Sequence, residues 1–390
     1  MKKNYIYLDN ASTTPLSKNV LEKINSTYDD YWFNPSSTYK YGIDCSLYLE
    51  KIRNNIADIF NAESEDIIFT SGSSESISIL FSNIFDKFKK GRLVISNVEH
   101  QSTIISSNKL KRHGWEIYEW LVNKEGLLNL SYINDALTKD TKLVSLIWGQ
   151  SEIGSLQPVQ YIGSRCQKLD IPFHVDGTQI LSNGIFNWNE LNCDALSLSA
   201  HKFGGPKGIG ILLTNKRSRQ FLKNKDISLS QEYSIRQGTQ ALPLIAGMYE
   251  AIKNINSKIY LTNTETQFSS NRVVDLKNYL KNTLFENRHI KITGSINQRI
   301  PNHISFILFN KKFEPIKAYK VINYMSEHNI AISSGSACSS SSGKPSLVLK
   351  NLGFKDKELY SNIRVSLGSM NKKSELDKFI KLIQDCIEIF

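Results

Sequence analysis

The chain has 390 residues, of which 40% are hydrophobic and 22% are charged, and its formal net charge is +11. These fractions are typical of an ordinary soluble globular protein, and the length predicts about two domains rather than a single core. The five cysteines are scattered and lack any C-x-x-C spacing, which argues against a disulfide framework or a zinc site and favours a reducing, cytoplasmic compartment.

The N-terminal letters "MKKNYIYLDNASTTP" lack the apolar core of a secretory signal. No stretch reaches the 18 apolar residues of a membrane span, so we expect no membrane association. The positive charge is spread along the chain in short runs, which favours a solvated surface over a nucleic-acid-binding stripe. Direct nucleic-acid binding is therefore not expected.

Between residues 66 and 215, short apolar runs alternate with helix-like stretches. Runs rich in Val, Ile, Leu and Phe predict buried strands within 66–74, 91–100, 141–149, 171–179, 193–202 and 208–214. The stretches 74–90 and 156–170 have the spacing of amphipathic helices. This alternation predicts an α/β fold with a mostly parallel sheet between helices, in a large domain over residues 15–258.

The C-terminal third has a different pattern. After residues 236–255 we expect a mostly helical connector to about residue 289. Beyond it, strand patterns within 289–296, 302–309 and 362–368, a helix near 314–327 and a final amphipathic helix predict a smaller α+β domain. We assign residues 1–14 and 259–390 to that domain.

Polar residues follow five of the predicted strands. In a parallel sheet, ligands gather at the carboxyl ends of the strands. The five ends carry Ser71 to Ser74, Glu99 and His100, Gln150 and Ser151, Asp176 and Gln179, and His201 and Lys202. We therefore predict a ligand site along this edge of the sheet.

Three of these residues suit a pyridoxal phosphate (PLP) site. Lys202 follows a buried strand, where lost solvation lowers the pKa of an amine and makes it nucleophilic enough to bind the cofactor covalently. Asp176 would keep the pyridine nitrogen protonated, as an electron sink requires, and Gln179 would donate to the phenolic oxygen. Taken alone, each motif favours the structural alternative, an exposed strand-end lysine for Lys202 and a helix cap for Asp176.

The stretch "TSGSSES" follows a strand and opens a helix, whose free N–H groups and dipole favour a phosphate group. Ser73 and Ser74 are the candidate ligands, with Ser199 and His201 beside the lysine. A plain helix cap with Glu75 in the first turn explains the same letters.

Two further residues have a functional and a structural interpretation. His100 is placed to stack on the pyridine ring and to serve as acid and base. Arg364 in "NIRVSLG" is suited to bind a substrate carboxylate through two hydrogen bonds. The alternatives are a structural histidine and an ordinary arginine on a strand.

Cys338 lies in "SSGSACSSSSGKPS", residues 333–346, where nothing is large enough to bury it. Free cysteines are usually buried. The alternatives are a chance thiol in a low-complexity segment or a nucleophile that must reach in two directions.

Together these motifs resemble the cysteine desulfurases, PLP enzymes of the class V aminotransferase group with fold type I. The matching stretches, in order, are "YLDNASTTP", "NPSSTYKYG", "FTSGSSES", "VEH", "SEIGSLQP", "HVDGTQ", "SAHKFGGPKGIGILL", "RQGT", "RIPNHISF", "SSGSACSSSS" with "KPSLVL", and "IRVSLG". They span nearly the whole chain. The resemblance implies a seven-stranded, mostly parallel sheet in the large domain and a small domain that carries the catalytic cysteine.

The resemblance also implies a role for each candidate residue. Lys202, Cys338 and His100 would be catalytic. The cofactor would be held by Lys202, Asp176, Gln179, Ser73, Ser74, Ser199, His201, His100 and Ser151, with Thr239 reaching the phosphate of a neighbouring subunit in a homodimer. The substrate, L-cysteine, would be held by Arg364, Asn34 and Asn10.

In this interpretation, the Cys338 thiolate takes the sulfur of L-cysteine, which leaves L-alanine and an enzyme-bound persulfide. The persulfide passes to an acceptor protein, such as an iron–sulfur scaffold or a tRNA-thiolation enzyme, and the length of the serine loop resembles the long-loop branch. The family pattern is changed at Ser151, Tyr39 and "SLSQE". Alternatives are a selenocysteine lyase, an aminotransferase, or a weakly catalytic sulfur-transfer subunit.

Overall fold

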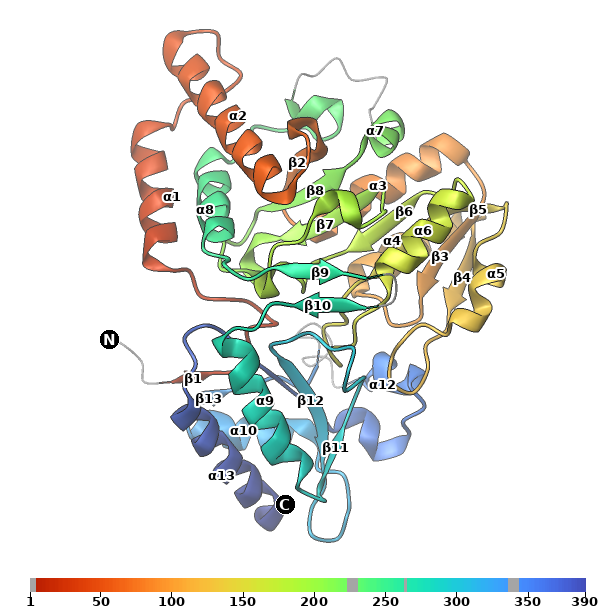
Figure 1. Ribbon diagram of the computed structural model, residues 1–390, viewed down its shortest axis with the longest axis vertical. Coiled ribbons are helices and arrows are strands. Elements are labelled where there is room, and N and C mark those ends of the chain that lie inside the picture. The colour runs from red at the N-terminus through yellow and green to blue at the C-terminus, as the bar shows by residue number, and fades with distance from the viewer. Residues whose placement is uncertain (1–4, 223–230, 263–264, 336–343) are drawn as a thin grey trace.

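The computed structural model describes residues 5–222, 231–262, 265–335 and 344–390. Figure 1 shows a large α/β unit around a twisted sheet and, below it, a smaller unit that contains both the first strand and the last helix. Separate clusters of buried apolar side chains fill the two units.

A seven-stranded sheet forms the centre of the large unit, as predicted. Its order is β2-β8-β7-β6-β5-β3-β4, and only β8 runs antiparallel to its neighbours. The strands are β2 (Ile67–Thr70), β3 (Arg92–Ser96), β4 (Glu116–Trp120), β5 (Thr141–Ile147), β6 (Phe173–Asp176), β7 (Ala195–Ser199) and β8 (Gly210–Thr214). Helices on both faces bury these strands, which is why most of them are apolar throughout.

Helices cover the two faces of this sheet. They are α1 (Lys18–Asp30), α2 (Lys40–Phe60), α3 (Ser73–Phe88), α4 (Gln101–Arg112), α5 (Ile133–Ala136), α6 (Val159–Lys168), α7 (Lys216–Leu222) and α8 (Leu242–Lys253). The apolar sides of α2, α6 and α8 share one core cluster, and those of α3, α4 and α7 share another. The sheet therefore separates two hydrophobic layers.

The small unit contains a three-stranded antiparallel sheet of β11 (Ile290–Ile292), β12 (His303–Leu308) and β14 (Asn362–Ser366). Its helices are α9 (Arg272–Phe285), α10 (Ala318–Glu327), α12 (Leu347–Asn351) and α13 (Lys373–Ile389). The strand β1 (Ile6–Tyr7) pairs in parallel with β13 (Ile330–Ala331). The N-terminal segment thus joins the small unit, while the helix that follows it, α1, packs against α8 of the large unit.

The structure corrects two expectations. β4 has no counterpart among the predicted strands, because this edge strand is half exposed and its buried residues form no continuous apolar run. The predicted helical connector before residue 289 is wrong over 259–261 and 266–268, where β9 (Ile259–Leu261) and β10 (Thr266–Phe268) pair in antiparallel fashion. Its β-branched and aromatic residues favour strands, and Trp148 Nε1 donates to Thr266 Oγ1 at 3.1 Å.

The domain limits at 14/15 and 258/259 stay a prediction. Among the described residues, no helix has both the length and the apolar character needed to cross a lipid bilayer.

Candidate active site

Five strands of the large sheet end at one edge with polar residues, because β2, β3, β5, β6 and β7 run parallel to one another. The N-terminal stretch, residues 9–14, crosses from the small unit to this edge and contacts several of the predicted site residues.

Lys202 lies just beyond β7, in a short 3-10 turn. Its Nζ donates to the carbonyl oxygens of Ala11 and Ser12, both at 2.8 Å. Gln179 Nε2 donates to the same Ala11 oxygen at 2.9 Å. The backbone of the N-terminal stretch therefore holds the amine of Lys202 and the amide of Gln179 close together.

Asp176 ends β6 and is buried. Its Oδ1 accepts from the backbone N–H of Thr178 at 3.0 Å and from the Thr178 hydroxyl. Its charge also acts on the residues after β3, two strands away in the sheet: it adds to the effect of burial that raises the pKa of Glu99, and it opposes the effect of burial that lowers the pKa of His100. A buried carboxylate at this place favours a cationic partner such as a protonated ring nitrogen.

His100 caps α4, and this contact defines its protonation. Its Nδ1 accepts from the Ser102 backbone N–H at 3.2 Å, so the proton of the neutral ring lies on Nε2. Burial has the largest effect on His100 and lowers its pKa; the charge of Asp176 opposes burial, and the charge of Lys202 lowers the pKa further. We therefore expect a neutral ring that presents an N–H donor.

Hydroxyl groups gather where α3 begins. The Ser73 backbone N–H donates to Ser199 Oγ at 2.8 Å, and Ser73 Oγ lies 2.6 Å from Thr178 Oγ1. The preceding Gly72 has φ +145°, and a Cβ there would lie 3.2 Å from Ser199 Oγ. These groups and the amino end of a 16-residue helix form a cradle with the donors that a phosphate requires.

Two other predicted phosphate ligands are placed differently. Ser74 is exposed in the first turn of α3. His201 contacts the N-terminal stretch, with Nδ1 at 3.2 Å from Thr13 Oγ1. Burial and the charges of Lys202 and Lys207 lower the pKa of His201 to about 4, so its ring is neutral near pH 7.

Arg364 on β14 is 1% exposed and lies beside the N-terminal stretch. Its Nη2 donates to Asp9 Oδ1 at 2.7 Å, and its Nη1 donates to the Ser151 carbonyl at 3.0 Å. Among the described residues, its buried Nε has no acceptor. A guanidinium with one donor left over can still bind a carboxylate group.

The structure brings only some of the other predicted residues to this cluster. Asn10 is buried, and its Nδ2 donates to the Ser366 carbonyl at 3.0 Å, two residues beyond Arg364. Asn34 is exposed, and its Oδ1 accepts from the Ser36 N–H at 2.9 Å in a local turn. Thr239 is also exposed and lines a small pocket with Ser71 of the same chain.

Sequence analysis missed Thr178 and Asp9, and it placed Glu99 at the site edge without giving it a role. Thr178 connects Asp176 with the hydroxyl cradle, and Asp9 orients Arg364. Glu99 is buried beside His100; burial raises its pKa to about 8, and its Oε2 has no partner in the described part of the chain. The letters "DGTQ" and "VEH" contain Thr178 and Glu99, so their motifs were the available signal.

The buried carboxylate, the neutral histidine, the hydroxyl cradle and the lysine fit PLP in donor type and place. Cys338 lies outside the described residues. The other four cysteines, Cys45, Cys166, Cys193 and Cys386, are buried, and burial raises the pKa of each. None of these four is poised as a thiolate near pH 7.

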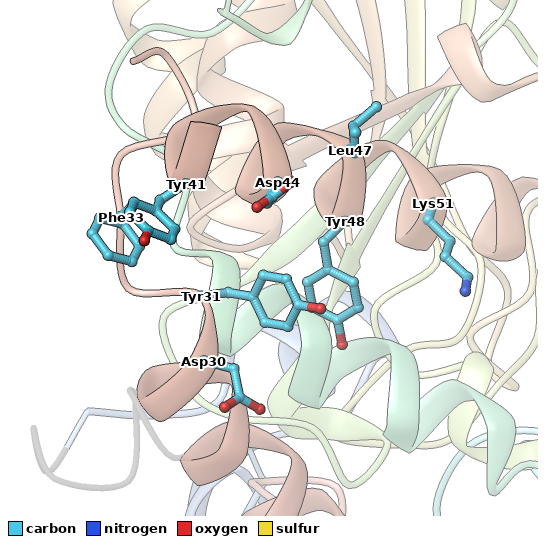
Figure 2. Close-up of a pocket in the computed structure, with 8 residues that line it drawn as sticks. All are labelled: Asp30, Tyr31, Phe33, Tyr41, Asp44, Leu47, Tyr48 and Lys51. Carbon is cyan, nitrogen blue, oxygen red and sulfur yellow. The ribbon is translucent and has the colours of Figure 1, made fainter. Parts of the chain in front are cut away.

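A separate pocket of about 480 Å³ lies between the end of α1 and the start of α2 (Figure 2). Aromatic pairs line it: the rings of Tyr31 and Tyr48 stack at 4.2 Å, and those of Phe33 and Tyr41 at 4.9 Å. None of the predicted site residues lines this pocket.

Comparison with known proteins places this geometry in context. Residues 6–379 match the model of the class-V aminotransferase family. A "Cysteine desulfurase, mitochondrial" of Candida maltosa is 36% identical over 98% of this chain and 77% of its own length. A "Cysteine desulfurase IscS" of Pectobacterium carotovorum is 33% identical over 98% of this chain and 92% of its own. A solved structure, "SspA in complex with cysteine", is 27% identical with a TM-score of 0.78, covering 93% of this chain and 98% of that one.

Proposed function

This chain belongs to the cysteine desulfurases of the class-V aminotransferase family, and from that premise we propose that it converts L-cysteine to L-alanine and that Cys338 receives the sulfur. The convergence of Lys202, Gln179 and Arg364 on residues 9–12 is the observation that carries the proposal. An amine and a guanidinium that contact one short segment support a site for an amino acid, whose carboxylate a guanidinium can bind.

PLP is the cofactor that we propose for this site. Lys202 would hold it covalently, Asp176 would face its ring nitrogen, and Ser73 and Ser199 would bind its phosphate group. When bound, PLP supplies an electron sink that labilises bonds of the substrate amino acid. The remaining assignments, Gln179, Ser74, His201, Ser151 and Thr239 as cofactor contacts and His100 as a stacking and acid–base residue, belong to the same proposal.

The substrate carboxylate would bind to Arg364. Its Nε is buried without an acceptor among the described residues, and Asp9 fixes the guanidinium plane through Nη2. A carboxylate that accepts from Nε would satisfy this donor and orient the amino acid toward Lys202. We assign Asn10 and Asn34 as further substrate contacts.

The sulfur step balances without an external oxidant. The thiolate of Cys338 forms a bond to the substrate sulfur, and the carbon–sulfur bond breaks with its electron pair left on the carbon. Protonation of that carbon gives the methyl group of alanine, and the enzyme retains a persulfide. Since the four described cysteines are buried with raised pKa values, they are poor alternatives to Cys338.

We further propose that the enzyme is a cytoplasmic homodimer and that its persulfide passes to an acceptor protein for iron–sulfur cluster assembly or tRNA thiolation. The support is the resemblance of the sequence to the long-loop desulfurases, together with the likeness to a bacterial relative named IscS.

The decisive test is the formation of alanine from L-cysteine, with a reductant, by the PLP-loaded protein and its Cys338→Ala variant. Cys45→Ala is the matched control, because it removes a buried thiol. We expect alanine from the parent and the control, and none from Cys338→Ala. Equal alanine formation by Cys338→Ala would refute the role of Cys338, and an inactive parent would refute the desulfurase activity itself.

A further inference from the structure

One buried glutamate, Glu152, lies against both ends of the segment that carries Cys338. This segment, residues 336–343, lies outside the described residues, but the positions before and after it are defined. Glu152 follows β5 in the large unit, whereas Gly335 and Ser346 belong to the small unit. The contact therefore joins the two units at the base of the segment.

The chain that follows the segment is held to Glu152 by a hydrogen bond. Ser346 Oγ donates to Glu152 Oε1 at 2.5 Å and accepts from the Leu349 N–H at 3.0 Å, which caps α12. This helix packs on the large unit through Leu349, in one apolar cluster with Ile153. The return of the chain from the segment is thus fixed to Glu152 and to the residue that follows it.

The chain that precedes the segment is held by packing against Glu152. Gly335 has φ +119°, and a Cβ at this position would lie 2.8 Å from Cδ of Glu152. Only glycine allows the backbone to approach the carboxyl group this closely. Two residues earlier, Ser333 exchanges backbone hydrogen bonds of 2.7 and 3.2 Å with Arg364, so this end is fixed in register beside the substrate-binding arginine.

Glu152 is itself fixed. It is 3% exposed, and its backbone N–H donates to Gln150 Oε1 at 2.6 Å. Burial raises its pKa to about 7, against the opposing effects of Ser346 and Arg364. Because its side chain is constrained in this way, Glu152 can hold the ends of the segment in a fixed position relative to Arg364.

We propose that Glu152 is a positioning residue that fixes both ends of the Cys338 segment relative to Arg364, and so keeps Cys338 within reach of the substrate sulfur. This inference rests on the proposed function. Fixing both ends of a short segment raises the effective concentration of a group that it carries, and with it the rate of an intramolecular step. Because Asp9 and the Ser151 carbonyl hold the guanidinium of Arg364, we expect substrate binding there to survive the loss of this restraint.

The test separates substrate binding from sulfur acceptance. Glu152→Ala removes the contact, Glu152→Gln keeps its shape and an acceptor oxygen, and Ser346→Ala removes only the hydrogen bond. Glu125→Ala is the matched control, because Glu125 is an exposed glutamate that accepts from Ser295 and contacts neither Gly335 nor Ser346. Each variant is loaded with PLP and then receives a single addition of L-cysteine.

Two quantities are then measured: the change in absorption of the bound cofactor with L-cysteine concentration, which reports substrate binding, and the rate at which Cys338 gains a sulfur, by mass spectrometry of the trapped persulfide. For Glu152→Ala we expect a half-saturating L-cysteine concentration within about twofold of the parental value. Its rate of persulfide formation should fall by about tenfold or more, because only proximity is lost. Glu152→Gln and Glu125→Ala should stay within about threefold of the parent, and Ser346→Ala should lie between, since it keeps the packing on Gly335.

A Glu152→Ala variant with parental persulfide rate would overturn the proposal. So would equal losses in substrate binding and persulfide rate, since these indicate a general defect. If Glu152→Ala does not fold, a parental rate in Ser346→Ala is the contradicting result. If the parent itself forms no alanine, the proposed function fails, and this outcome is distinct from the others.

Discussion

The buried ion pair of Arg53 and Glu232 supports a strained turn, and breaking it should destabilise the large unit. Each residue is 2% exposed, and two hydrogen bonds of 2.9 Å join the guanidinium to the carboxylate. Glu232 and the next two residues all have positive φ, at 42°, 54° and 64°, although none is glycine. Such a turn persists only where its surroundings hold it.

Arg53→Met leaves the carboxylate of Glu232 buried with two neutral donors, the Phe69 N–H at 2.8 Å and Gln240 Nε2 at 3.1 Å. Removing one partner of a buried pair costs about 3–5 kcal/mol. With an unfolding entropy of roughly 2.1 cal/mol/K per residue, this corresponds to a fall in Tm of about 5 °C if the whole chain unfolds together, and more if the large unit unfolds alone.

The assay is thermal and urea unfolding followed by far-ultraviolet circular dichroism. Arg53→Met/Glu232→Met should be less destabilised than Arg53→Met alone, because no buried charge remains, although the Phe69 N–H then lacks its acceptor. Lys18→Met, at an exposed pair with Glu22, is the control and should change nothing measurable. A loss below about 1 kcal/mol in Arg53→Met, or losses that simply add in the double variant, would refute this reasoning.

Two further predictions concern the site edge. Burial raises the pKa of Glu99 to about 8 in the folded state, above its unfolded value. Its contribution to stability is therefore present at low pH and is lost as the pH rises toward 8. Between pH 5.5 and 8.5 the Tm should fall less in Glu99→Gln than in the parent, and parallel curves of Tm against pH would contradict this. A Cβ on Gly210 would lie 2.3 Å from the Leu198 carbonyl and 2.6 Å from Gly72 Cα, so Gly210→Ala should displace the turn before α3. We expect its PLP affinity, measured by absorbance titration, to fall about tenfold or more, because the cradle depends on aligned N–H donors; unchanged affinity would show that this turn does not bind the phosphate.

The sheet could be predicted from sequence because its central strands are buried on both faces and therefore read as continuous apolar runs. The edge strand β4 could not, since only Trp120 is fully buried in it. Polar residues at the ends of parallel strands necessarily share an edge, which is why Asp176 and Lys202 could be assigned to one site before the structure was known.

Contacts made by backbone groups or by distant segments leave no such signal. The acceptors of Lys202 are carbonyl oxygens of Ala11 and Ser12, and any residue type provides them. Glu152 belongs to the motif "SEIGSLQP", but nothing in that motif indicates that its carboxyl group accepts a hydrogen bond from Ser346, 194 positions away. Propensity and periodicity describe local structure, whereas these contacts depend on how the two units pack.

The N-terminal stretch explains why the site needs both units. Asp9 reaches Arg364 across 355 positions, and Ala11 reaches Lys202 across 191. One short segment thus orients the residue that would bind the substrate carboxylate and the amine that would bind the cofactor. Since contacts between such distant positions form only after the intervening chain has folded, the binding geometry is completed when the small unit docks on the large one. Glu152 contacts Gly335 and Ser346 across the same boundary, so the residues that we propose to bind cofactor and substrate and to position the Cys338 segment all depend on the packing of one unit on the other.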